Sequence, residues 1–302
     1  MQNDLTIDLS ATRKRPVERT VRVALFICAA LSVAVTAGII YSLLSDTVAF
    51  FREVNLWGYI SGTNWSPQSG SFGVLELVWG TLIITVGAML IAGPLGIGTA
   101  IYLSEYAPNR VRRVVKPVLE MLAGIPTVVF GYFALNFITP NLLRRIYEGC
   151  GIFNWASAAI VVGIFIVPTV ASLSEDAMRA VPRALRDGAY GLGATKLSVS
   201  LKVVFPAALS GIVAASILGI SRAIGETMAV TIAAGATPQI VLNPCASVQT
   251  MTAYIVQVAG GEASRGSIEY GSIFALGATL FCMTLLLNYL SMRLVKRFRE
   301  VY

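Results

Sequence analysis

Long apolar runs separated by short polar segments dominate the sequence. Six of these runs are free or nearly free of charge, and each is close to or longer than the roughly 18 residues that a helix needs to cross a bilayer. The pattern therefore predicts an all-α integral membrane protein with six transmembrane helices. The predicted spans are residues 23–44, 77–103, 118–140, 155–174, 206–235 and 270–292.

The overall composition supports a membrane protein. Hydrophobic residues make up 56% of the chain and charged residues 13%, and the mean hydropathy is +0.73. Ordinary soluble domains carry about 25% charged residues. The first run has basic residues before it, as a signal peptide does, but it is longer than the usual apolar core of about 7 to 15 residues. We therefore expect an uncleaved helix, in one membrane domain of residues 21–302 that follows an N-terminal tail of residues 1–20.

Positive charge is distributed unevenly between the two sides of the predicted membrane domain. Most of the 23 Lys and Arg residues lie in the N-terminal tail, the second and fourth loops and the C-terminus. An excess of Lys and Arg marks cytoplasmic segments, so both termini are predicted to be cytoplasmic. The net charge of +7 then reflects this topology and contact with anionic lipids rather than nucleic-acid binding.

Two of the four cysteines fall in loops predicted to lie outside. Cys150 and Cys245 would be in an oxidising compartment, where a disulfide can form. Sequence does not show whether the two approach bonding distance, so a bridge and a chance pair both remain open. Cys28 and Cys282 lie inside predicted spans, where a thiol usually acts as a small core residue.

The fifth predicted span carries two charges. Arg222 follows Pro206 by 16 residues, which on a helix is about 24 Å, near the middle of the bilayer core. Glu226 is one turn further, so the pair is expected to share one helix face. Two interpretations stay open: a buried ionic clip that fixes helix packing, and an arginine that lines an aqueous cavity and binds an anion.

The same span has a strip of small residues at every fourth position, which allows another helix to approach closely. Packing within the chain and packing against a partner are both consistent with it. The strip consists of Gly211, Ala215, Gly219 and Ala223.

The loop over residues 181–206 differs from the others because it contains helix signals. Pro182 suits the first turn of a helix, Gly193 suits a helix end, and Thr195 can cap a second helix. Apolar residues at i, i+4 and i+7 predict that this second helix is amphipathic; they are Leu197, Leu201 and Val204. Such an element either rests on the lipid surface or docks a protein partner.

The spacing of this loop resembles the cytoplasmic signature of permease subunits in binding-protein-dependent ABC importers. In that signature a Glu-Ala-Ala triplet precedes a glycine, and an Ile-x-Leu-Pro segment follows nine residues later. Asp187 and Gly188 depart from the first two signature residues. The matching positions are Asp187, Gly188, Ala189, Gly193, Val203, Phe205 and Pro206. The segments LAGIPTVVFGYFAL (122–135), SRAIGETMAV (221–230) and YGSIFALGATLF (270–281) resemble the phosphate branch of the family, PstC type.

The resemblance implies a type I ABC importer permease fold in the inner membrane and a function in ATP-driven phosphate import. The chain would form half of the translocation pathway, with Arg222 binding phosphate and Glu226 holding the guanidinium and partly offsetting its charge. The partners implied are a PstA-like second permease, two PstB-like ATPase subunits and an extracytoplasmic PstS-like phosphate-binding protein. The chain has no phosphate-binding loop of its own, so ATP is expected on the ATPase subunits.

Other functions would need residues or elements that can be sought in the sequence. The chain has no His and no visible cluster of acids or cysteines, so we expect neither an enzyme, a cofactor nor a metal site. A permease for another oxyanion remains an alternative, and so does an anion channel, since an arginine in a cavity suits either. A channel, however, has no need of an ATPase docking element.

Overall fold

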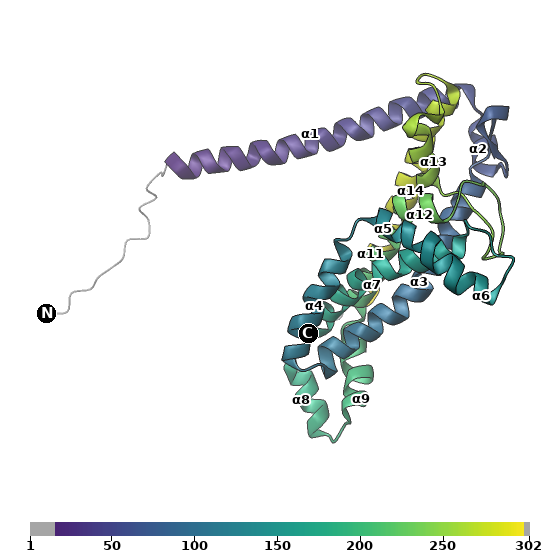
Figure 1. The fold of residues 1–302 in the computed structure, drawn as a ribbon. Helices are drawn as coiled ribbons and strands as arrows, with labels where there is room; N and C mark the ends of the chain where they lie inside the picture. Colours follow the sequence, from purple (N-terminus) through teal and green to yellow (C-terminus); the bar gives the residue numbers. More distant parts are fainter. Residues whose placement is uncertain (1–15, 299–302) are drawn as a thin grey trace.

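A computed structural model describes residues 16–298, and helices account for most of them (Figure 1). Residues 1–15 and 299–302 lie outside the described part, and with them most of the predicted tail of residues 1–20. Residues 16–20 are the first residues of helix α1.

The elements follow one another along the chain with short connections. The longer helices are α1 (Pro16–Glu53), α3 (Leu75–Ile101), α4 (Asn109–Ala123), α7 (Trp155–Arg179), α8 (Arg183–Gly191), α11 (Leu209–Ile224) and α14 (Ile268–Phe298). The shorter ones are α2 (Leu56–Ser61), α5 (Thr127–Phe133), α6 (Arg144–Ile146), α9 (Lys196–Val199), α10 (Phe205–Ala207), α12 (Met228–Ala233) and α13 (Met251–Gln257). Four π-helical segments are η2 (Tyr102–Tyr106), η3 (Ala134–Leu143), η4 (Ser200–Val204) and η5 (Val258–Glu262), and η1 (Pro67–Ser69) is a 3-10 turn inside the hairpin of β1 (Trp65–Ser66) and β2 (Ser71–Phe72).

Four of the six predicted spans lie within long helical segments. Among the described residues, four segments are long and apolar enough to cross a membrane: Glu18–Glu53, Leu75–Tyr106, Trp155–Arg179 and Ile268–Arg293. Two further pairs of helices meet the same criterion only when taken together across a sharp bend. The structure therefore has between four and six candidate spans.

The predicted span of residues 118–140 is not one straight helix. The chain breaks between α4 and α5, and the segments on either side are inclined at 87°. Pro126 has no backbone N–H and disfavours a helical conformation at Ile125, so the helix ends at Ala123. The hydrophobic run continues through the break, and hydropathy alone therefore did not reveal it.

The predicted span of residues 206–235 is broken twice. The segments Lys196–Ala207 and Leu209–Ile224 are bent by 71° next to Pro206. A second break separates α11 from α12 at residues 225–227. Consequently Arg222 and Glu226 are not on one continuous helix.

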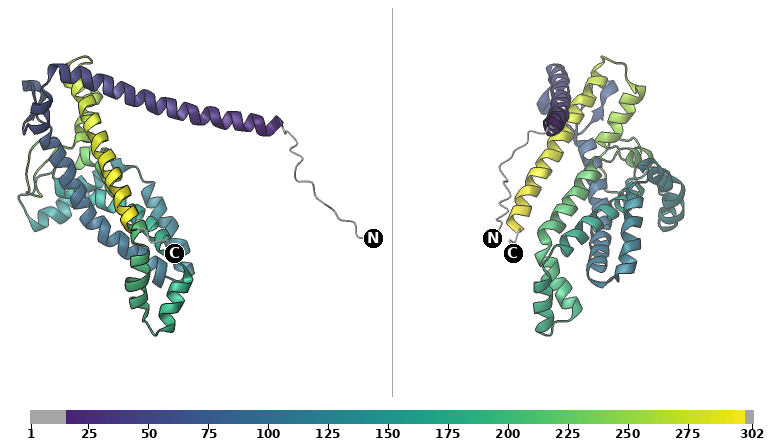
Figure 2. Two further views of the ribbon diagram at one scale, coloured as in Figure 1. Left: turned by 180° about the vertical axis from the view of Figure 1, so that it is seen from behind. Right: turned by 90° about the vertical axis from the view of Figure 1, so that its left-hand side faces the viewer.

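The centre of the molecule is the packing of α3 and α11 on α7, where small residues bring the backbones together (Figure 2). A Cβ added to Gly163 of α7 would lie 2.9 Å from the carbonyl oxygen of Ala88 on α3. The strip of small residues on α11 faces α7: a Cβ on Gly211 would overlap Ala177, and one on Gly219 would lie 3.0 Å from Ile166. This geometry supports packing within the chain.

Helix α1 packs on α14 only through its C-terminal part, where Thr47 donates a hydrogen bond to the carbonyl oxygen of Phe274 at 3.0 Å. Its N-terminal half projects away from the other helices, and its apolar side chains there are exposed (Figures 1 and 2).

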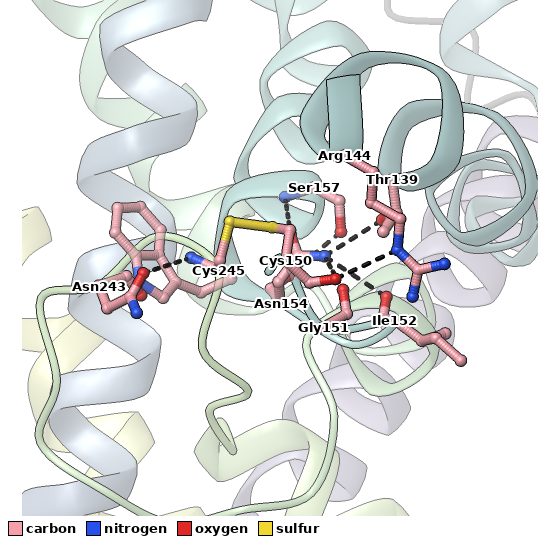
Figure 3. Close-up of a disulfide and its surroundings, with 10 residues drawn as sticks. Thr139, Arg144, Cys150, Gly151, Ile152, Asn154, Ser157, Asn243 and Cys245 are labelled. Carbon is pink, nitrogen blue, oxygen red and sulfur yellow. Dashed lines mark hydrogen bonds between the residues drawn. A yellow bond between two sulfur atoms is a disulfide. The ribbon is translucent and has the colours of Figure 1, made fainter. Parts of the chain in front are cut away.

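The end of the molecule opposite α8 and α9 is closed by an extended segment, residues 234–250, which we call the strap. Trp79 on α3 and Trp155 on α7 donate indole hydrogen bonds to the carbonyl oxygens of Val241 and Asn243, at 2.9 and 2.7 Å. Cys150 and Cys245 form a disulfide that joins the strap to the loop before α7 (Figure 3). Of the two alternatives that the sequence left open, the structure has the bridge.

The strap passes so close to α3 that we expect the addition of one methyl group to have different effects at two glycines of that helix. A Cβ on Gly80 would overlap the carbonyl oxygen of Gln249, whereas nothing lies within 4 Å of a Cβ on Gly93 of the same helix. We expect Gly80→Ala to lower the free energy of unfolding by about 1–3 kcal/mol through overpacking, and Gly93→Ala to leave it unchanged or raise it. Thermal unfolding of both variants in detergent is the test, and equal midpoints would contradict the close approach.

Candidate functional site

Arg222 lies against the middle of α7. Its guanidinium carbon is 4.0 Å from the centroid of the Phe165 ring, and one of its terminal nitrogens donates a hydrogen bond to the Thr169 hydroxyl at 2.9 Å. Phe165 and Thr169 flank the central residue of a 25-residue helix, which places the guanidinium near mid-depth of this candidate span. An aromatic ring attracts a cation through its negative face, so Phe165 holds the charge without neutralising it.

Glu226 does not pair with Arg222. Among the side chains that the structure describes, the ion pairs closer than 4.0 Å join Lys116, Arg179 and Arg186 to acids, and none involves Arg222. The predicted i,i+4 pair is therefore wrong in this structure, because the helix ends at Ile224 before the fourth residue is reached.

Glu226 instead stabilises the break after α11. Its carboxylate accepts a hydrogen bond from the backbone N–H of Ala229 in the first turn of α12, at 3.2 Å. Its carbonyl oxygen accepts one from the Thr252 hydroxyl at 2.8 Å. The residue is buried, with 8% of its surface exposed. A carboxylate beside the N-terminus of a helix satisfies a free backbone donor and suits the helix dipole.

The loop predicted to contain two helices forms a hairpin of α8 and α9. Helix α8 ends at Gly191, and two residues later Gly193 has φ +79°, the left-handed conformation that glycine adopts without strain. The N–H groups of Gly193 and Ala194 donate to the carbonyl oxygens of Tyr190 and Ala189, at 2.9 and 3.1 Å. These two bonds satisfy the last carbonyls of the helix in a Schellman motif. Thr195 then caps α9 by accepting from the N–H of Ser198.

The second helix of the hairpin does not bury the predicted apolar face. Leu197 and Leu201 are 59% and 47% exposed, and only Val204 of the three predicted residues is buried. From Ser200 the helix continues as the π-helical η4, which shifts the register of the side chains from Leu201 onward; Leu197 precedes this segment and is exposed on α9 itself. Val199 and Val204 are buried in an apolar cluster with α3, α7 and α11, while Leu192 at the tip of the hairpin is 91% exposed.

The signature residues divide between exposed and packed positions. Asp187 and Gly188 lie on the exposed surface of α8. Ala189, Val203 and Phe205 pack against the apolar cluster below the hairpin, and Pro206 lies in the first turn of α10, next to the bend before α11.

Two side-chain contacts of the hairpin were not predicted from the sequence. Arg186 on α8 pairs with Glu105 in η2, with nitrogen–oxygen distances of 3.1 and 3.3 Å to one carboxylate oxygen. Lys196 on α9 lies 5.0 Å from the centroid of the Tyr106 ring. Glu105 and Arg186 are 81 positions apart, and no local pattern in the sequence connects them.

A third polar contact joins α4 to α7. Lys116 donates hydrogen bonds to Glu175 at 2.8 Å and to Asp176 at 2.5 Å, and Glu175 is fully buried. The adjacent acids Glu175 and Asp176 could be recognised in the sequence near the end of a predicted helix. The sequence did not show that Lys116 is their partner. No group of three or more His, Cys, Asp or Glu side chains in residues 16–298 is arranged to hold a metal ion.

Comparison with known proteins identifies the family. Residues 92–300 match the family described as binding-protein-dependent transport system inner membrane component. The chain belongs to this family of permeases. The phosphate transport system permease protein PstC of Mesorhizobium japonicum is 33% identical over 263 residues, which cover 80% of each chain. The probable ABC transporter permease protein YqgH of Bacillus subtilis is 36% identical over 241 residues, which cover 78% of this chain and 77% of the relative.

Solved structures show the same fold. A chain of a bacterial ABC transporter involved in the import of the acidic polysaccharide alginate superposes with a TM-score of 0.63 at 15% identity, covering 95% of this chain and 100% of that one. A chain of the inward-facing MetNI methionine ABC transporter gives a TM-score of 0.54 at 18% identity, covering 76% and 95%. The chain is therefore an inner-membrane, multi-pass permease with the type I importer fold. The expected resemblance to PstC-type subunits is confirmed.

The Schellman motif predicts different effects for the same substitution at two glycines of the hairpin. Gly191 and Gly193 both have free space where a Cβ would stand, but only Gly193 has a positive φ. We expect Gly193→Ala to cost about 1–2 kcal/mol of local stability and to reduce co-purification with the ATPase subunit, and Gly191→Ala to preserve it. Pull-down of the ATPase by each variant at matched expression is the measurement. Equal recovery would contradict the expectation that this turn shapes a surface that binds the ATPase.

Proposed function

We propose that this chain is the PstC-type permease subunit of an ATP-driven phosphate importer and forms half of its translocation pathway. The proposal rests first on curated relatives named as phosphate transport permeases, which are 30–33% identical over most of this chain. The solved structures with this fold come from transporters of other substrates, so fold alone does not select phosphate.

The observation that carries the substrate assignment is the unneutralised charge of Arg222. A cation at mid-depth of a bilayer costs at least about 2.5 kcal/mol unless it meets water, protein or an opposite charge. Phe165 and Thr169 orient the guanidinium and use one of its five donors, and no carboxylate among the described residues lies within 4.0 Å. The remaining donors suit a phosphate oxyanion in a planar fork geometry.

In this proposal Glu226 contributes to the pathway by fixing its backbone. By capping α12 it holds open the break that follows Arg222. This role replaces the expected one, in which Glu226 offset the arginine charge directly.

The α8–α9 hairpin is the proposed docking element for the ATPase subunits. Apolar side chains exposed at its tip and on α9 suit a protein groove, and Asp187, Gly188 and Gly193 are exposed on the same hairpin. ATP would bind only to those partner subunits. A PstA-like permease and a PstS-like binding protein complete the proposed assembly. Uptake through a simple anion channel would require no such hairpin.

The proposed topology has six spans with both termini in the cytoplasm. Each bent helix pair then counts as one span, and the α8–α9 hairpin is cytoplasmic. The disulfide and the strap face the extracytoplasmic side, where oxidising conditions favour a disulfide. Binding of a loaded binding protein outside and closure of the ATPase subunits inside would alternate access to Arg222 by rigid-body movement.

The substrate assignment predicts that Arg222→Gln abolishes most phosphate uptake without impairing ATP hydrolysis. Losing a charge-assisted hydrogen bond of about 1.5–3 kcal/mol corresponds to a roughly 10- to 100-fold decrease. Labelled phosphate uptake and ATP hydrolysis are measured in proteoliposomes that contain the complete assembly.

The control is Arg110→Gln, which removes a charge from the exposed surface of α4. It should leave uptake near the wild-type rate. If Arg222→Gln transports phosphate as fast as this control, then Arg222 is structural and the oxyanion path lies elsewhere.

A further inference from the structure

The side chain of Arg186 connects three separate elements at the hairpin end of the molecule. Besides its two hydrogen bonds to Glu105 of η2, it donates to the carbonyl oxygens of Met178 and Val181, at 2.8 and 2.6 Å. Met178 lies in the last turn of α7, and its carbonyl oxygen also accepts a hydrogen bond from the backbone N–H of Val181 at 3.3 Å. Arg186 itself lies on α8.

This contact is largely removed from solvent. The side chains of Arg186 and Glu105 are 15% and 6% exposed. The same carboxylate oxygen of Glu105 also accepts a hydrogen bond from the Ser104 hydroxyl at 3.0 Å, which fixes its orientation. A guanidinium held by four hydrogen bonds in a planar fork has little freedom to slide.

The surrounding packing does not by itself fix the hairpin. Beneath α8, residues such as Ala100, Met178 and Leu185 form an apolar cluster. Apolar contact is not directional and allows one surface to shift over another. Lys196 above the Tyr106 ring adds a second attachment to η2, but an exposed cation–π contact is weak.

We propose that Arg186 and Glu105 are positioning residues that make α8, α7 and α3 move as one body when the ATPase subunits close. We call Arg186, Glu105 and the two carbonyl groups the Arg186 bracket. Force on α8 then reaches the membrane through two helices at once, because η2 continues α3 and Met178 belongs to α7. The inference rests on the proposed function, since it takes the hairpin as the docking element.

The first test separates transport from hydrolysis in the complete assembly. We expect Arg186→Gln and Glu105→Gln each to retain the ATPase subunits and most ATP hydrolysis, while phosphate transported per ATP falls about tenfold. Because the two residues act as one unit, the double variant should also lose about tenfold, whereas independent effects would multiply to about 100-fold. Arg110→Gln, on the exposed surface of α4 and outside the proposed docking hairpin, is the control.

A purely structural role gives a different result. If the pair merely stabilises the fold, uptake and hydrolysis decline in parallel with the amount of assembled complex, and phosphate transported per ATP stays at the wild-type value. That result would overturn the proposal, as would a multiplicative double variant.

The second test measures the movement directly and requires no transported substrate. Spin labels are placed through Arg183→Cys on α8 and Leu95→Cys on α3, after Cys28 and Cys282 are replaced by Ser; both labelled positions and both free cysteines are exposed. In the complete assembly with Glu105 and Arg186 intact, we expect the distribution of distances between the two labels to be the same with and without trapped ATP. In the Glu105→Gln variant, we expect trapped ATP to shift or broaden that distribution. A wild-type distance that changes between the two states would refute rigid coupling.

These measurements keep the two proposals apart. If the wild-type assembly hydrolyses ATP but takes up no phosphate, the substrate assignment fails, while the spin-label distances still decide whether the bracket couples α8 to α3.

Discussion

The bilayer core offers no water to solvate a charge or an unpaired backbone group, and this constraint explains where the polar chemistry of the chain lies. The ion pairs between side chains that the structure describes lie at the hairpin end, between α4, α7, α8 and η2. Arg222 departs from this distribution because its guanidinium lies at mid-depth, supported by a ring and a hydroxyl. A position this costly for a cation is hard to explain by packing alone, which is why it carries the substrate assignment.

The same constraint applies to the helix breaks. After α11 the chain frees backbone groups inside the molecule, and Glu226 and Thr252 bond two of them. The strap is likewise satisfied by tryptophan indoles of α3 and α7 and tied by a disulfide. Irregular backbone is tolerated at membrane depth where protein groups satisfy it or where it lines a cavity. Protein groups satisfy the backbone at the break after Arg222, and in the proposed pathway this break also lines a cavity.

The sequence predicted the features that depend on local composition. Charge-free runs predicted helices, Gly193 and Thr195 predicted the turn and the cap of the hairpin, and the spacing of the signature predicted the family. Prediction from the sequence failed where contacts between distant segments determine the structure. Hydropathy continued through the break at Gly225, so Glu226 was wrongly paired with Arg222, and the π-helical η4 shifted the register at Leu201, which is exposed. Arg186 and Glu105 have no sequence signal, because only the fold brings η2 beside α8.

In the proposed pathway, the guanidinium of Arg222 is kept free of an acidic partner so that it can receive an oxyanion. The most direct measurement is a cryo-electron microscopy structure of the complete assembly, with loaded binding protein and trapped ATP, at a resolution that shows side chains. We predict tetrahedral density within hydrogen-bond distance of the Arg222 guanidinium, with Phe165 and Thr169 still in contact. Arg222 paired with a carboxylate of either permease, and phosphate bound elsewhere, would contradict the account.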